Sequence, residues 1–138
     1  LVARQVCGLV EGTTISFEDP KQQIGALKTI AERVKDGKPY LIFPEGGYTD
    51  NKNELQEFKS GCFSCSLKSK TPIVPVVIYD SWRSMDTNTF EKVRTQVYFL
   101  PPIPYEEYGK LRKHDVCELV KKRIQEKLDE LKEADPRR

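Results

Sequence analysis

The chain has 138 residues, of which 38% are hydrophobic and 32% charged, and its 23 basic and 21 acidic residues give a net charge of +2. This composition is typical of a folded globular domain and argues against a disordered chain. The nearly balanced charge gives no support to a nucleic-acid-binding function, and no apolar run approaches the roughly 20 residues of a membrane span. The four cysteines are too sparse for a disulfide scaffold, which favours a reducing cytosol.

The first ten residues, LVARQVCGLV, form an apolar segment that starts with leucine instead of methionine. This segment lacks the pattern of a signal peptide. We therefore expect an N-terminally incomplete domain, in which part of a sheet precedes Leu1.

The clearest predicted helix follows Asp19 and ends before Gly37. Asp19 has the residue type of an N-cap, Pro20 suits the first helical position, and a glycine is common just after a helix. The spacing of apolar residues predicts one buried face, made of Ile24, Leu27, Ile30, Ala31 and Val34.

Two apolar stretches, 39–43 and 72–80, predict short buried strands, and residues 57–68 between them show helical spacing. Both stretches are continuously apolar, as central parallel strands are, and the strand–helix–strand order predicts a right-handed crossover. Residues 93–100 alternate in polarity and predict a strand covered on one face, made of Val93, Thr95, Val97 and Phe99.

The last predicted element is an amphipathic helix over about 115–134. Asp115 and Glu118 have the spacing of a capping box. The apolar stripe is expected to contain Val116, Val120, Ile124, Leu128 and Leu131. Taken together, the elements predict a single α/β domain over 1–138, with a mixed, largely parallel sheet flanked by helices.

The stretch YLIFPEGGYTD at 40–50 places a glutamate and two glycines directly after a predicted strand. In an open α/β sheet, ligands bind beyond the carboxyl ends of the strands. Glycine lets a ligand approach the backbone, and Glu45 offers oxygens to a hydroxyl or a cation. A helix start near Ser60 and Gly61, with Lys59 beside it, is suited to an anion. The pattern predicts a site for a ligand with hydroxyl and phosphate groups; the alternative is a plain glycine turn.

Cys62 and Cys65 form a CxxC pair, which suits either a redox centre or half of a zinc site. Further ligands for zinc would have to come from the scattered Cys7, Cys117 and His114. We therefore predict that both cysteines lie on the apolar face of a helix and fill the protein core, with no metal site. The alternative, a cytosolic thiol or metal protein, predicts bound zinc or unusually acidic thiols.

Three blocks in register resemble the glycerolipid acyltransferases, specifically the 1-acylglycerol-3-phosphate (lysophosphatidate) acyltransferase family. FPEG at 43–46 resembles the family's phenylalanine-proline-glutamate-glycine block, and FKSG at 58–61 its phenylalanine-lysine-x-glycine block. VPV at 74–76 resembles the valine-proline-valine strand that follows. The order and spacing agree over most of the chain.

The resemblance implies transfer of an acyl group from acyl-CoA or acyl carrier protein to lysophosphatidate, giving phosphatidate in phospholipid biosynthesis. It implies a cytoplasmic protein, peripheral at the inner face of the cell membrane, and no cofactor. It places Glu45, Gly46, Gly47, Lys59 and Pro75 at the acceptor site, and it accounts for a proline inside a predicted strand.

The chain departs from the family pattern in its catalytic pair, which is a histidine followed five residues later by an aspartate. The only histidine is His114, and Leu119 stands five residues after it. We therefore predict that His114 is solvent-exposed, that no catalytic residue lies in this chain and that the chain alone is inactive. The alternative is a non-catalytic domain of the same ancestry that binds lipid phosphate or acyl carrier protein.

Two arginines of the family pattern are also replaced in this chain. Gly47-Tyr48 stands where the family often has threonine-arginine, and Phe17-Glu18 where its block before the first helix ends in arginine. We therefore expect phosphate binding to depend more on Lys59, on backbone N–H groups, or on the segment expected before Leu1.

Overall fold

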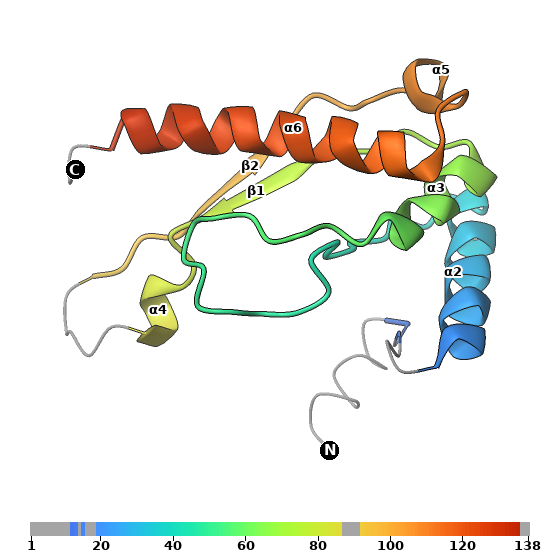
Figure 1. The fold of residues 1–138 in the computed structure, drawn as a ribbon, viewed down its shortest axis with the longest axis horizontal. Helices are drawn as coiled ribbons and strands as arrows, with labels where there is room; N and C mark the ends of the chain where they lie inside the picture. Colours follow the sequence, from blue (N-terminus) through green and yellow to red (C-terminus); the bar gives the residue numbers. More distant parts are fainter. Residues whose placement is uncertain (1–11, 14, 16–18, 87–91, 136–138) are drawn as a thin grey trace.

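The computed structural model describes residues 12–13, 15, 19–86 and 92–135 (Figure 1). It has an α/β fold, with a two-stranded sheet and helices around it. The elements are α2 (Pro20–Lys35), η1 (a 3-10 helix, Ser60–Phe63), α3 (Ser64–Ser69), β1 (Val76–Tyr79), α4 (Arg83–Asp86), β2 (Gln96–Phe99), α5 (Tyr105–Tyr108) and α6 (Lys113–Glu133).

Helix α2 begins and ends where its sequence predicts. The Asp19 carboxylate accepts hydrogen bonds from the backbone N–H groups of Lys21, at 2.9 Å, and Gln22, at 3.2 Å. Gly37 follows the helix with a φ of +85°, and its N–H group donates to the carbonyl of Val34 at 3.0 Å. Both ends of α2 are therefore capped by the residues that the sequence indicated.

The buried face of α2 is narrower than predicted. Leu27, Ile30 and Ala31 are buried, but the side chain of Ile24 is 64% exposed. Ile30 and Ala31 pack with Cys65 of α3 and with the extended segment 40–42. Because these partners cover the C-terminal half of α2, its first turns remain open to solvent.

The sheet differs from the largely parallel sheet that the sequence predicted. Within the described residues, β1 and β2 pair antiparallel, with Val76 opposite Phe99 and Tyr79 opposite Gln96. An isolated bridge joins Ile73 to Ile103. The predicted strand at 39–43 is extended but has no ladder partner among the described residues, so the predicted parallel crossover is not present there.

The covered face of β2 is the opposite of the predicted one. Val97 and Phe99 are 52% and 75% exposed, whereas Tyr98 is half-buried and packs against the core. Alternation in the sequence shows which residues share a face, but not which face α6 covers. The apolar side chains were therefore assigned to the wrong side of the sheet.

Helix α6 carries the main core of the described chain. Val116, Val120, Ile124 and Leu128 of its stripe are buried as predicted, and they pack against β1, η1 and α5. Leu131, also predicted in the stripe, is only partly buried. The helix begins at Lys113, two residues earlier than predicted. The predicted capping box is wrong, because the Asp115 carboxylate binds the Arg112 guanidinium, at 3.0 Å. No helix in the described part of the chain combines the length and the apolarity that a bilayer crossing requires.

Candidate functional site

Residues 43–46 form a tight β-turn. The Gly46 N–H group donates to the carbonyl of Phe43 at 3.2 Å, which places Pro44 second and Gly46 fourth in the turn. Proline at the second position and glycine at the fourth are both favoured in β-turns. Gly46 has a φ of +73°, a left-handed conformation that residues with a Cβ adopt at a cost.

The two predicted blocks, FPEGG and FKSG, lie against each other. The Lys59 N–H group donates to the Pro44 carbonyl at 2.7 Å. The half-buried Glu45 carboxylate accepts from the backbone N–H of Gln56 at 3.4 Å, and the Gln56 amide donates to the Gly47 carbonyl at 3.1 Å. Three hydrogen bonds therefore hold the turn against the segment that leads into η1.

A pocket of about 270 Å³ lies where these two blocks meet α2. Its apolar wall comes from α2 and the extended segment before the turn, and its polar wall from the residues around the start of η1. The lining residues are Ile15, Gln23, Leu27, Ile42, Phe43, Pro44, Lys59, Ser60, Gly61 and Cys62. The pocket thus places one cation beside an apolar surface, a combination that suits an amphiphilic anion.

The attraction for an anion in this pocket comes mainly from Lys59. Its side chain is exposed, and among the described residues it has no carboxylate partner. The predicted helix start at Ser60 is confirmed, but η1 is only a four-residue 3-10 helix. Because the dipole of such a short helix is small, the lysine charge outweighs it.

The structure brings only part of the predicted site together. Lys59 lines the pocket, whereas Glu45, Gly46 and Gly47 do not. Pro75 is buried just before β1, and its carbonyl accepts the N–H of Leu100 at 2.9 Å. Pro75 therefore does not interrupt the ladder, because it precedes the first paired residue.

Sequence patterns did not indicate that α2 contributes to this pocket. Gln23 and Leu27 line it from the helix, and Ile42 lines it from the extended segment. Leu27 and Ile42 were assigned to the core because both are apolar. The amphipathic face of α2 was the available signal, but its proximity to Lys59 depends on tertiary packing.

Comparison with known proteins identifies the family. The family model described as Acyltransferase matches residues 2–79, more than half of the chain. The chain belongs to the acyltransferase family. It is 29% identical over 117 residues to the 1-acyl-sn-glycerol-3-phosphate acyltransferase of Escherichia coli (strain K12), covering 82% of this chain and 47% of that protein. It is 36% identical over 72 residues to a chloroplast enzyme of the same name from Brassica napus, covering 51% of this chain and 20% of the other.

A solved structure supports the acyltransferase fold. The 1-acyl-sn-glycerophosphate acyltransferase PlsC from Thermotoga maritima matches with a TM-score of 0.74 and 17% sequence identity, over 94% of this chain and 51% of that one. These matches confirm the resemblance to the lysophosphatidate acyltransferases. This acyltransferase chain spans about a fifth to a half of the length of the relatives named here.

Three cysteines lie in the described part of this acyltransferase chain. Cys62 lines the pocket, and Cys65 and Cys117 each belong to a buried hydrophobic cluster. Cys65 and Cys117 are buried, and Cys62 is half-buried, with its thiol donating to the Lys59 carbonyl at 3.0 Å. Burial, with the nearby Cys65 and Cys117, raises the pKa of Cys62 to about 12. Burial also raises the pKa of Cys65 and of Cys117. Neutral thiols are poor nucleophiles, and the described residues contain no cluster that would hold a metal ion.

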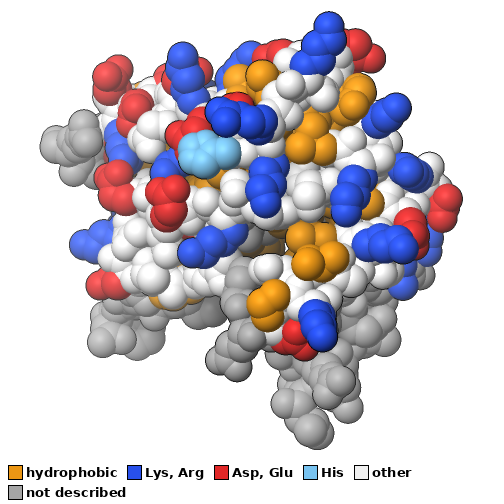
Figure 2. Space-filling view, turned by 45° about the vertical axis from the view of Figure 1, so that its right-hand side comes forward, with side chains coloured by type: hydrophobic (Ala, Val, Ile, Leu, Met, Phe, Trp, Pro, Cys, Tyr) orange, Lys and Arg blue, Asp and Glu red, His pale blue; other side chains and the backbone are white. Residues whose placement is uncertain are grey.

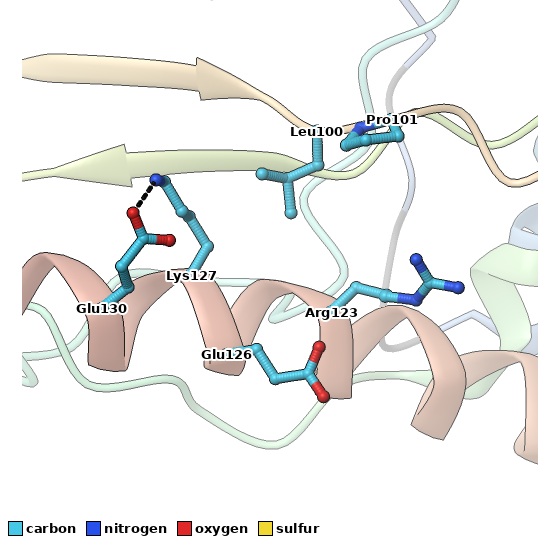
Figure 3. A pocket seen from close by; sticks show the side chains of 6 residues that line it. All are labelled: Leu100, Pro101, Arg123, Glu126, Lys127 and Glu130. Carbon is cyan, nitrogen blue, oxygen red and sulfur yellow. Dashed lines mark hydrogen bonds and ion pairs between the residues drawn. The ribbon is translucent and has the colours of Figure 1, made fainter.

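A second pocket of about 220 Å³ lies between α6 and the end of β2 (Figure 3). Its charged side chains all come from α6: Arg123, Glu126, Lys127 and Glu130. Lys127 pairs with Glu130 at 2.7 Å, and Arg123 pairs with Glu107 at 3.1 Å. Since its cations are paired and it contains none of the family blocks, this pocket is the weaker candidate for substrate binding.

His114 is the second residue of α6. Its side chain is exposed, as predicted, and the single histidine is visible on the surface in Figure 2. His114 lines neither pocket.

Proposed function

We propose that this chain forms part of an enzyme that transfers a fatty acyl group from acyl-CoA or acyl carrier protein to lysophosphatidate, giving phosphatidate. The proposal is supported by the family match and by the names of the relatives. The observation that carries it at the level of residues is the pocket that joins Lys59 to the apolar side chains of Leu27, Ile42 and Phe43.

The chemistry of the acceptor fits this pocket. A lysophosphatidate molecule has a phosphate at one end and an acyl chain at the other. The phosphate would bind at Lys59, and the apolar wall would hold the first part of the chain. The pocket is smaller than the roughly 300–1,000 Å³ of typical ligand sites, so most of the lipid would remain outside it. This arrangement is in keeping with a peripheral position at the cytoplasmic face of the membrane, which we propose for the protein.

Glu45 has a supporting role in this proposal. Its carboxylate holds the segment before Lys59 through the N–H of Gln56, so it would position the phosphate-binding lysine without touching the acceptor. Gly46 allows the turn that this contact needs. Pro75 has no contact with the pocket, and its role would be to place the strand β1.

A binding experiment tests the role of Lys59. The purified chain is titrated with lysophosphatidate and with an uncharged monoacylglycerol of the same chain length. We expect Lys59→Ala to weaken lysophosphatidate binding by roughly tenfold, since a charge-assisted contact is worth about 1.5–3 kcal/mol, and to leave monoacylglycerol binding unchanged. The difference should shrink at high salt because the contact is exposed.

The matched control is Lys68→Ala. Lys68 is exposed on α3 and does not line the pocket, so the net charge changes equally in the two variants. Equal weakening by both variants would show a general charge effect and would contradict a specific phosphate site at Lys59.

A second candidate is a non-catalytic domain that binds lipid phosphate or acyl carrier protein. It is favoured by one observation, namely that the pocket exists in a chain without a histidine-x4-aspartate pair. The two candidates differ in the complete polypeptide: turnover of lysophosphatidate with acyl-CoA or acyl carrier protein supports the enzyme, and binding without turnover supports the non-catalytic domain.

A further inference from the structure

Exposed cations gather where the end of α3 meets the start of α6. They are Lys70, Lys110, Arg112 and Lys113, hereafter the basic patch. The Tyr108 hydroxyl joins the two segments, because it is hydrogen-bonded to the carbonyls of Ser66, at 3.2 Å, and Thr71. The two halves of the basic patch therefore lie beside each other, although they are distant in the sequence.

The lysines of the basic patch have no partner within the described fold. Arg112 binds Asp115 at 3.0 Å, but no carboxylate among the described residues lies within ion-pair distance of the three lysines. By contrast, the cations further along α6 that pair with carboxylates are Lys121, Lys122, Arg123, Lys127 and Lys132. The charges of the basic patch are therefore free to meet an anionic partner.

The position of the basic patch does not help the stability of α6. Lys113 is the first residue of this helix, and Arg112 is its N-cap without a side-chain hydrogen bond to the helix. Cations are unfavourable at the positive end of the helix dipole. The stability of α6 therefore does not account for these charges, whereas contact with an anionic partner does.

An apolar side chain stands inside the basic patch. Leu111 lies between Lys110 and Arg112 and is 38% exposed. Figure 2 shows this side of the molecule, with the single histidine, His114, at the start of α6 and Lys and Arg side chains beside it. An apolar centre within a polar rim is the arrangement of a protein–protein interface.

Acidic residues next to the basic patch favour a protein partner over a membrane. Glu106 of α5 and Glu118 of α6 are both exposed. An anionic bilayer is wide and flat, so it would meet these carboxylates together with the cations and repel them. An acidic helix is only about 10 Å wide and can contact the cations without meeting either glutamate.

One continuous helical segment connects the basic patch with the candidate pocket. Lys59 and Ser60 line the pocket at the start of η1, and Lys70 follows the last residue of α3. The four residues of η1 and the six of α3 rise by roughly 17 Å in total. A pantetheine arm has the length of about five extended residues and spans a similar distance.

We propose that the basic patch is the docking surface for an acidic carrier protein that delivers the acyl group to the pocket on a pantetheine thioester. An acidic helix of the carrier lies across the start of α6, where Leu111 contacts an apolar side chain of that helix. The arm runs along α3 to the pocket. This inference rests on the proposed acyl transfer and names the donor that uses this surface.

Donor kinetics of the complete polypeptide test the proposal. Michaelis constants are measured for the palmitoyl-acyl carrier protein of Escherichia coli and for palmitoyl-CoA, at a fixed lysophosphatidate concentration. We expect Lys110→Glu and Lys113→Glu each to raise the constant for the carrier-bound donor at least tenfold and to leave that for palmitoyl-CoA unchanged. The effect should shrink at high salt, because the contacts are between exposed charges.

The matched control is Lys122→Glu, which makes the same change of charge. Lys122 lies roughly two and a half turns after Lys113, on the opposite side of α6, and its side chain is 75% exposed. This variant should leave both Michaelis constants unchanged. Lys113→Glu places a carboxylate at the start of α6, so it should not lower the melting temperature.

Equal increases for both donors would identify a nucleotide or membrane site and overturn the proposal. Equal effects of Lys113→Glu and Lys122→Glu would show a general charge effect and also overturn it. Loss of sedimentation with phosphatidylglycerol vesicles in Lys113→Glu, with unchanged binding of the carrier protein, would identify a membrane and have the same consequence.

A binding measurement separates this proposal from the proposed reaction. If neither donor is turned over, the reaction fails, but calorimetry still measures binding of the palmitoyl-acyl carrier protein to the complete polypeptide. Binding that Lys113→Glu weakens at least tenfold supports the docking surface. The absence of binding, or binding that this variant leaves unchanged, overturns it.

Discussion

At the scale of single residues, the FPEGG block is a turn whose parts have different tasks. Gly46 provides the left-handed conformation, and Glu45 binds the segment that carries Lys59. Space around Gly47 does not require a glycine, since a Cβ there would meet no atom within 4 Å. Two neighbouring glycines therefore have different structural importance.

Substitution of the two glycines separates these roles. Gly46→Ala should lower the free energy of unfolding by about 1 kcal/mol, because a Cβ is unfavourable in the left-handed region. Gly47→Ala should have no effect or a slightly stabilising one. Denaturant unfolding of both variants measures the difference, and equal losses would contradict the conformational argument.

The half-buried thiol of Cys62 predicts a dependence of stability on pH. Burial raises its pKa from 9.0 to about 12 in the folded protein, so between these values the folded state retains a proton that the unfolded state releases. The contribution of Cys62 to stability is therefore complete below pH 9 and is lost as the pH rises toward 12.

Cys62→Ser removes this titration and keeps a group of similar size. We expect the unfolding free energy of the serine variant to fall less steeply above pH 9 than that of the original chain. The original chain should also react slowly with thiol reagents at neutral pH. Parallel pH profiles for the two proteins would mean that Cys62 titrates as a solvent-exposed thiol does.

At the scale of elements, α6 holds the described fold together. Its buried stripe contacts β1, η1 and α5, and Lys121 and Lys132 reach Glu57 and Glu54 of the loop before η1, at 3.1 Å and 2.7 Å. These ion pairs are at the surface and contribute little each, so the apolar stripe dominates the energetics.

A truncation in the stripe tests this ranking. Leu128→Ala removes a side chain that is 2% exposed and should lower the unfolding free energy by about 2–5 kcal/mol. Lys132→Ala removes the pair with Glu54 and should cost less than about 1 kcal/mol. Thermal or denaturant unfolding compares them, and a larger loss for Lys132→Ala would reverse the order proposed here.

At the scale of the whole molecule, the 138 residues contain the candidate binding pocket but no histidine followed five residues later by aspartate. The 138 residues contain one histidine, His114, which is exposed and lines neither pocket. The linings of the two described pockets therefore contain no histidine.

We therefore expect the purified 138-residue chain to show no acyl transfer from acyl-CoA to lysophosphatidate. A positioned general base contributes roughly 10²–10⁴ in rate, and no histidine lines the described pocket. Product formation is measured at increasing chain concentrations, with His114→Ala as the control. Turnover that scales with the chain and persists in His114→Ala would show that another group acts as the base.

Local chemistry was enough to predict much of this protein from its sequence. The cap at Asp19, the glycine at Gly37, the stripe of α6 and the three family blocks all depend on neighbouring residues, and the structure or the family match confirms each of them. The position of Lys59 directly before a helix start was also predicted from the sequence, and the structure places it just before η1. These features are determined by residue type and short-range spacing.

Only the tertiary structure decided the remaining features. Which face of β2 is covered depends on where α6 packs. Alternation in the sequence defines two faces but does not tell which of them is covered. The pocket wall at Leu27 and the partner of Glu45 both come from segments distant in sequence. A sequence pattern specifies which side chains are apolar or charged, but the free energy of packing decides which of them meet.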